Sequence, residues 1–152
     1  MSLTSKASGR WVNKILNIPS ILSKKWDFLY YQVINQSEAL FTGPFYRDCL
    51  NALTEQGILA AQIGDIFFDT ELVLDIFSEL KEIFPIVRIF RTHIPSYTLV
   101  LYSFAFCSKA LRPEMELGLL RFSRNFQTRY YNDQIHKAAF ALPEHLREEF
   151  KQ

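Results

Sequence analysis

Short apolar runs that alternate with amphipathic segments most constrain the fold of this chain. Three runs of strand length, 26–34, 58–62 and 86–94, are separated by two segments whose apolar residues recur at helical spacing. A fourth run, 99–106, is nearly continuous in apolar residues, which is typical of a strand covered on both faces. The order strand, helix, strand, helix, strand, strand predicts an α/β domain that ends in a hairpin.

The two helical segments have recognisable start and stop signals. The first begins at Pro44, which suits a first helical position, and we expect Gly57 to end this helix as its C′ residue. The second begins after a cap at Asp69 or Thr70 and stops before Pro85. Its apolar residues repeat at i, i+3, i+4 and i+7, and they are Val73, Ile76, Phe77, Leu80, Ile83 and Phe84.

The tail of the chain carries further helical patterns. Apolar residues from Met115 to Phe126 recur at helical spacing, and a shorter helix is predicted from Asn132. Pro143 opens a final turn or two. No repeat, low-complexity tract or linker interrupts residues 40–150, and 152 residues suit a single domain.

The composition excludes several classes of partner and site. Seventeen basic and 16 acidic residues give a formal net charge of +1, which provides no global field for binding nucleic acid. The five glycines lie too far apart for a Gly-x-Gly-x-x-Gly or other phosphate-binding loop. No apolar run reaches the roughly 18 residues of a membrane-spanning helix. We therefore expect neither a nucleic-acid partner nor a membrane span.

The cysteines and histidines show no spacing that favours a metal site. Cys49 and Cys107 lie far apart and form no Cys-x-x-Cys motif, so we expect two buried free thiols in a reducing cytoplasm. His93, His136 and His145 show neither His-Glu-x-x-His spacing nor a nearby Gly-x-Ser-x-Gly motif. The sequence therefore predicts no metal centre and no hydrolase chemistry.

The first 26 residues are basic and carry an apolar stripe. All five of their charged side chains are basic, and apolar residues recur every three or four positions. One interpretation is a transit peptide or a membrane-surface helix. The other, favoured because Pro19 interrupts the pattern and arginine is scarce, is a solvated N-terminal helix that packs its stripe on the domain.

Three blocks of the sequence carry a resemblance to a known family. The first is residues 38–62, beginning Glu-Ala-Leu-Phe; the second runs from Ile-Pro-Ser-Tyr at 94–97 to Cys-Ser-Lys at 107–109. The third is the tail block Arg-Tyr-Tyr-Asn-Asp-Gln-Ile-His-Lys-Ala-Ala-Phe-Ala-Leu-Pro at 129–143. In this order the blocks resemble the spermidine synthases, which are polyamine aminopropyltransferases.

The resemblance implies both a fold and an activity. Residues 37–152 would form the C-terminal part of the catalytic domain, a partial Rossmann-like fold of the S-adenosylmethionine-methyltransferase type, and residues 1–36 would be a divergent segment. Family members transfer an aminopropyl group from decarboxylated S-adenosylmethionine to putrescine or a longer polyamine. Such a segment at 1–36 would fit an alternative exon, a truncated gene model or a diverged sequence.

The resemblance assigns three residues to binding the acceptor amine. Tyr97 matches the family's diamine-contacting tyrosine, since an aromatic face can hold an alkylammonium chain. Gln62 matches a glutamine at a strand end facing the family's pocket, and Asp65 lies near the family's glutamate. The alternatives are structural: a core-packed tyrosine, ordinary polarity at an edge, and a loop residue before a helix. We interpret His136 as a structural histidine that joins the tail to the domain.

Other parts of the family's site have no counterpart in this sequence. The glycine-rich nucleotide loop and the acidic residue for the ribose are absent, and the stretch 29–36, where the family carries its catalytic aspartates, contains no carboxylate. We therefore assign no catalytic residue and expect the isolated chain to bind the donor poorly. The alternative function is a non-catalytic module that pairs through strand 26–34 with itself, as a homo-oligomer, or with a full-length synthase.

Overall fold

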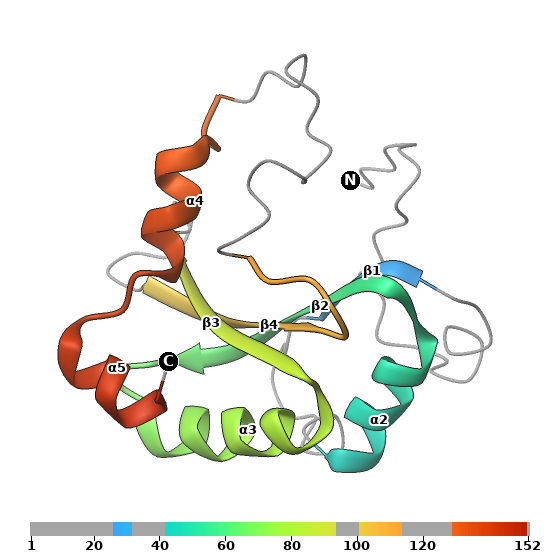
Figure 1. Cartoon of the computed structure of the whole chain (residues 1–152). Helices are drawn as coiled ribbons and strands as arrows, with labels where there is room; N and C mark the ends of the chain where they lie inside the picture. The colour runs from blue at the N-terminus through green and yellow to red at the C-terminus, as the bar shows by residue number, and fades with distance from the viewer. Residues whose placement is uncertain (1–25, 32–41, 94–100, 114–128, 152) are drawn as a thin grey trace, which may run out of the picture.

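The structure is a computed structural model that describes residues 26–31, 42–93, 101–113 and 129–151. In these ranges the chain forms a four-stranded sheet with helices on both faces (Figure 1). The elements are β1 (Trp26–Tyr31), α2 (Gly43–Ala52), β2 (Leu53–Asp65), α3 (Thr70–Ile83), β3 (Ile86–His93), β4 (Leu101–Ser108), α4 (Asp133–Phe140) and α5 (Glu144–Phe150).

The sheet has the strand order β1-β2-β4-β3 and is mixed. β1 pairs with β2 in parallel, whereas β4 pairs antiparallel with both β2 and β3. β2 and β3 therefore run in the same direction, and their carboxyl ends, Asp65 and His93, lie at the same end of the sheet on either side of β4. The predicted α/β class and the order of its elements are confirmed.

The two faces of the sheet are covered by different helices. α2, α3 and α5 pack on one face, where alternate residues of β2, namely Leu59, Ala61 and Ile63, join the buried core. α4 lies over the other face (Figure 1), which carries Ile58 and Ala60. Because side chains alternate between faces along a strand, Gln62 lies on the α4 side.

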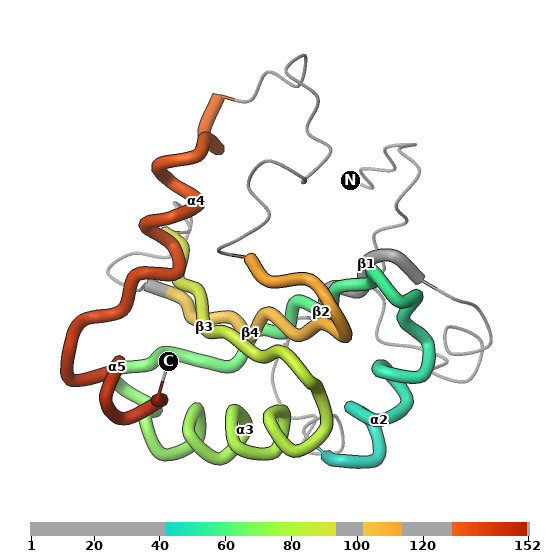
Figure 2. Tube along the Cα trace, in the orientation of Figure 1, coloured from blue at the N-terminus to red at the C-terminus, as the bar shows by residue number. Residues whose placement is uncertain are grey.

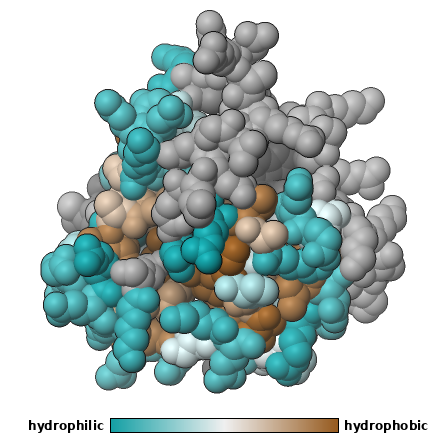
Figure 3. Space-filling model, viewed as in Figure 1, coloured by the Kyte–Doolittle hydropathy of each residue, from teal (hydrophilic) through white to brown (hydrophobic). Residues whose placement is uncertain are grey.

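The C-terminal helix α5 packs against α3, a helix from the middle of the chain. α5 lies beside α3 (Figure 2), and the ring of Phe150 packs edge-on against that of Phe77 at a centroid distance of 5.4 Å. On the face in Figure 3, polar side chains cover the outer surfaces, and apolar side chains come to the surface near the middle. The hydrophobic core thus includes side chains from Tyr46 in α2 to Phe150 in α5.

One predicted boundary is wrong. Gly57 does not end the first helix, because α2 stops at Ala52 and Gly57 lies within β2. Leu53 already has extended backbone angles, is fully buried and pairs with Trp26 of β1. Its carbonyl also accepts a hydrogen bond of 2.8 Å from Lys109 Nζ. Burial and strand pairing at Leu53 therefore start the strand before the glycine is reached.

The other predicted elements fall within a few residues of those observed. β4 continues two residues beyond 106, and Asp69 occupies the N-cap position of α3 without a capping side-chain hydrogen bond. Asn132 caps α4 through its side chain, which accepts from the Ile135 amide at 2.9 Å. The predicted helix at 115–126, the N-terminal pattern and strand residues 32–34, 94 and 99–100 lie outside the described residues.

Both cysteines are buried free thiols, as predicted. Within the described ranges, no helix combines the length and apolar character needed to cross a membrane. In the same ranges, His, Cys, Asp and Glu side chains form no group of three or more that could hold a metal ion.

Candidate functional site

The carboxyl end of β2 contains a β-bulge. Gln62 pairs with Phe104 of β4, and Gly64 pairs with the next residue of β4, Ser103, so Ile63 is the extra residue. Gly64 has φ +108°, a conformation that L side chains rarely adopt. The glycine therefore allows the strand to bend at this point.

The bulge changes which side chains share a face. In a regular strand, residues three apart point to opposite faces. Here Asp65 pairs with Tyr102 and Gln62 pairs with Phe104, and these two partners are two residues apart on β4. Because directly paired residues share a face, Gln62 and Asp65 lie on the same face of the sheet. The structure thus brings together two of the three residues assigned from sequence.

Gln62 is a buried amide with an unused acceptor. Gln62 is 8% exposed, and among the residues that the structure describes its Oε1 has no hydrogen-bond partner. β2 lies between β1 and β4, so Gln62 is on an interior strand of the described sheet. An unsatisfied buried acceptor costs about 1–3 kcal/mol, which a ligand N–H donor would recover. Gln62 Oε1 can therefore accept a hydrogen bond from a donor group of a ligand.

Asp65 uses one carboxylate oxygen to hold the turn into α3. Asp65 is 8% exposed, and its Oδ1 accepts from the backbone amides of Phe67 at 2.8 Å and Phe68 at 3.1 Å. Its backbone carbonyl accepts from the Asp69 amide at 2.8 Å. These hydrogen bonds show that Asp65 stabilises the turn before α3. They agree with the structural alternative from the sequence, a loop residue before a helix. Tyr97 lies outside the described residues.

His136 joins α4 to the segment after β4, as predicted. Its Nε2 donates to the Pro113 carbonyl at 3.1 Å, so in a neutral ring Nδ1 is the acceptor. The Tyr131 hydroxyl lies 2.7 Å from Nδ1. Burial and, to a smaller extent, the Asp133 carboxylate raise the pKa of Tyr131. The tail therefore docks through a continuous hydrogen-bond path.

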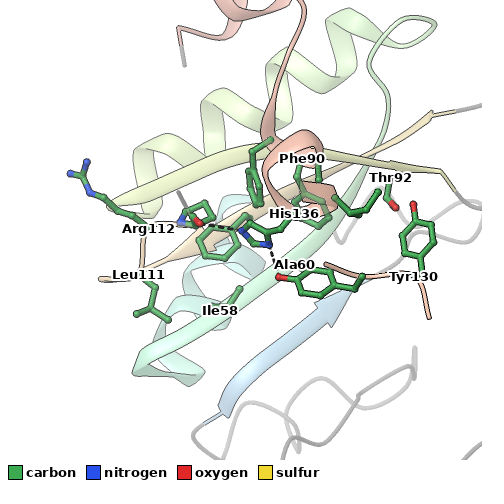
Figure 4. Close-up of a pocket in the computed structure, with 14 residues that line it drawn as sticks. Ile58, Ala60, Phe90, Thr92, Leu111, Arg112, Tyr130 and His136 are labelled. Carbon is green, nitrogen blue, oxygen red and sulfur yellow. Dashed lines mark hydrogen bonds between the residues drawn. The ribbon is translucent and has the colours of Figure 1, made fainter. Parts of the chain in front are cut away.

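An apolar pocket lies between α4 and the sheet (Figure 4), and its volume is about 310 Å³. Ile58 and Ala60 of β2, Phe90 of β3 and Phe106 of β4 form its floor, and α4 contributes Phe140 among others. Gln62 and Asp65 do not line it. The sequence did not predict this pocket, although the even-numbered positions of each strand and the apolar stripe of the tail helix carried the signal.

The positive φ of Gly64 leads to a stability prediction. A Cβ at this position would meet Val73 Cγ2 at 3.6 Å and Asp69 Oδ2 at 3.7 Å, which are ordinary contacts. Gly64→Ala should therefore destabilise through backbone strain alone, by about 1–2 kcal/mol. Urea denaturation of both proteins measures this difference. An unchanged midpoint would contradict the strained conformation at residue 64.

Comparisons with known proteins agree on one family. The profile of the spermine/spermidine synthase domain matches residues 8–117, so the match starts N-terminal to residue 37. The polyamine aminopropyltransferase of Alkaliphilus metalliredigens is 38% identical over 121 residues, covering 78% of this chain and 43% of that protein. The enzyme of that name from Clostridium kluyveri is 42% identical over 108 residues, covering 70% of this chain and 38% of that protein.

Solved structures agree with the sequence comparisons. Spermidine synthase from Thermotoga maritima superposes with a TM-score of 0.67 at 26% identity, covering 87% of this chain and 46% of that chain. A spermidine synthase in complex with the transition state analogue AdoDATO gives a TM-score of 0.66 at 26% identity, covering 87% of this chain and 47% of that one. The chain spans less than half the length of these relatives. It belongs to the spermine/spermidine synthase family.

Proposed function

We propose that this chain supplies the acceptor-amine side of a polyamine aminopropyltransferase site. The observation that carries the proposal is the buried Oε1 of Gln62, near the carboxyl end of β2, which has no hydrogen-bond partner in the described part of the chain. Membership of the family supports an amine as the donor that this oxygen accepts from. Putrescine is the proposed ligand, and by family resemblance Tyr97 is the proposed contact for its second ammonium. The free thiols fit a reducing cytoplasm.

The chemistry of the family defines what such a site must do. A neutral amine nitrogen attacks the aminopropyl carbon next to the sulfonium of decarboxylated S-adenosylmethionine. The new C–N bond forms as the C–S bond breaks, methylthioadenosine leaves as a neutral thioether, and the nitrogen gives up a proton. Gln62 Oε1 can accept a hydrogen bond from an N–H group of the amine and so orient it. Alignment of the two reactants lowers the barrier to the reaction.

We expect the isolated chain to bind amine but to transfer aminopropyl groups poorly. The stretch 29–36 offers no carboxylate to take the proton, and loss of a general base costs about a hundredfold or more in rate. The measurement is formation of methylthioadenosine from the donor and putrescine. Turnover at the rate of a complete synthase would contradict this expectation.

Replacing Gln62 tests the proposed amine site. Gln62→Leu keeps the volume but removes the acceptor, so putrescine binding by calorimetry should weaken about tenfold or more. Stability should not fall, because the variant also removes an unsatisfied buried group. Gln56→Leu is the matched control, since Gln56 is an exposed glutamine on the same strand. Equal putrescine affinity in wild type and Gln62→Leu would refute the assignment.

A second candidate function is association with another family member. β1 forms one edge of the described sheet, and an edge strand offers backbone groups for pairing. The relatives are more than twice as long as the matched region. A complete synthase therefore contains a further part against which this chain could pack. Size-exclusion chromatography with a full-length synthase separates the possibilities. Co-elution without turnover favours association, whereas amine binding by a monomer favours the first proposal.

A further inference from the structure

The carboxylate of Asp65 lies on the same face of the sheet as Gln62. Its hydrogen bonds to backbone amides indicate a structural role rather than direct binding of a cationic ligand. We propose that Asp65 is a positioning residue: its carboxylate fixes the bulged end of β2, and this holds Gln62 Oε1 toward the amine. The inference rests on the proposed function of Gln62 and deepens it. It assigns Asp65 no direct contact with an ammonium group.

The hydrogen bonds of the turn support this role. Asp65 Oδ1 accepts from the amides of Phe67 and Phe68, and the Asp65 carbonyl accepts from the Asp69 amide. The next turn is closed by Thr70 Oγ1, which donates to the Ile66 carbonyl at 2.8 Å. Ile66 itself is fully buried in the core. The end of β2 is thereby fastened to the start of α3.

The bulge explains how a fixed turn can orient Gln62. Because Ile63 is an extra residue in β2, the side chains of Gln62 and Asp65 lie on the same face of the sheet. If the strand relaxes to regular pairing, a one-residue shift of register moves side chains to the opposite face. Without the carboxylate, the amides of Phe67 and Phe68 lose their acceptor, so the turn that directly follows the bulge loses two hydrogen bonds. The orientation of Gln62 would then no longer be unique.

A rival role for Asp65 is direct attraction of an ammonium group by its negative charge. The two roles need different atoms. Positioning needs only an acceptor at Oδ1, which the neutral carboxamide of asparagine also supplies. Attraction needs the charge, which asparagine lacks. Asp65→Asn and Asp65→Ala therefore separate the two roles.

The experiment is calorimetric titration of putrescine into the full chain and three variants. Asp65→Asn should keep the affinity within about twofold, whereas Asp65→Ala should weaken it about tenfold or more. Asp69→Ala is the matched control, because it removes an exposed neighbouring carboxylate that makes no capping hydrogen bond, and it should leave the affinity unchanged. Equal losses in Asp65→Asn and Asp65→Ala would overturn the proposal in favour of charge attraction.

A second readout does not depend on the ligand. Amide hydrogen exchange at Phe67 and Phe68 should be slow in wild type and Asp65→Asn and at least about tenfold faster in Asp65→Ala. The side-chain NH₂ signals of Gln62 should broaden or split in the alanine variant alone. If wild type binds no putrescine, the proposed function fails, but these signals still decide the role of Asp65. Unchanged exchange and unchanged Gln62 signals in Asp65→Ala would overturn the positioning role.

Discussion

Replacing Phe150 with alanine is expected to lower the free energy of unfolding by about 3–5 kcal/mol. Phe150 is 2% exposed, and its ring packs edge-on against Phe77 with an interplanar angle of 84°. α5 is only seven residues long, too short to be stable without tertiary contacts. Its buried residues are Leu146 and Phe150, so the substitution removes about half of the apolar anchor of this helix.

The matched control for this prediction is Phe68→Ala. Phe68 is 82% exposed, so the same substitution should change the free energy of unfolding by less than about 0.5 kcal/mol. Urea denaturation followed by circular dichroism measures both variants. A loss of similar size at the two positions would show that α5 does not belong to the core.

Raising the pH above about 9 is expected to destabilise the folded chain through its buried thiols. Burial, with a smaller contribution from the Asp48 carboxylate, raises the pKa of Cys49 from 9.0 to about 12. Burial, with a smaller contribution from Cys49, also raises the pKa of Cys107 well above 9.0. The unfolded chain therefore releases these protons first. The stabilisation is complete below pH 9 and is lost as the pH rises toward the folded pKa of Cys49, about 12.

The size of this effect can be measured against a variant without thiols. Each buried thiol should lower stability by up to about 1.4 kcal/mol per pH unit in this window. Urea midpoints at a series of pH values from about 8 to 11 should fall more steeply for wild type than for the Cys49→Ala, Cys107→Ala double variant. The double variant corrects for lysines and tyrosines that titrate over the same range. Parallel pH profiles for the two proteins would contradict the burial of the thiols.

The local patterns of the sequence predict most of the elements because they depend on nearby residues. The spacing of Val73, Ile76, Phe77 and Leu80 predicts α3, and these four side chains are indeed the buried ones of that helix. Pro85 marks its end for a steric reason. The failure at Gly57 has the opposite origin, since pairing of Leu53 with β1 is a contact across the sheet that overrides a local stop signal.

The candidate site is only partly predictable, since its geometry depends on pairing between strands. Gln62 and Asp65 were identified by resemblance, but alternation along a strand would place them on opposite faces. The bulge at Ile63 reverses that expectation, and only the register with β4 reveals it. Gly64 is the one local sign, because a glycine inside a strand often marks a bulge. The apolar pocket likewise combines residues from 58 to 140, which no local pattern joins.

The most direct test of this account is an NMR titration of the ¹⁵N-labelled chain with putrescine. The two surfaces on the same face of the sheet, the carboxyl end of β2 and the pocket under α4, give separate signals. Binding at Gln62 predicts shifts at its side-chain amide and at the backbone amides around it, with Ala139 and Phe140 unaffected. Shifts confined to Ala139, Phe140 and the pocket, or no shifts at Gln62 at saturating putrescine, would contradict it.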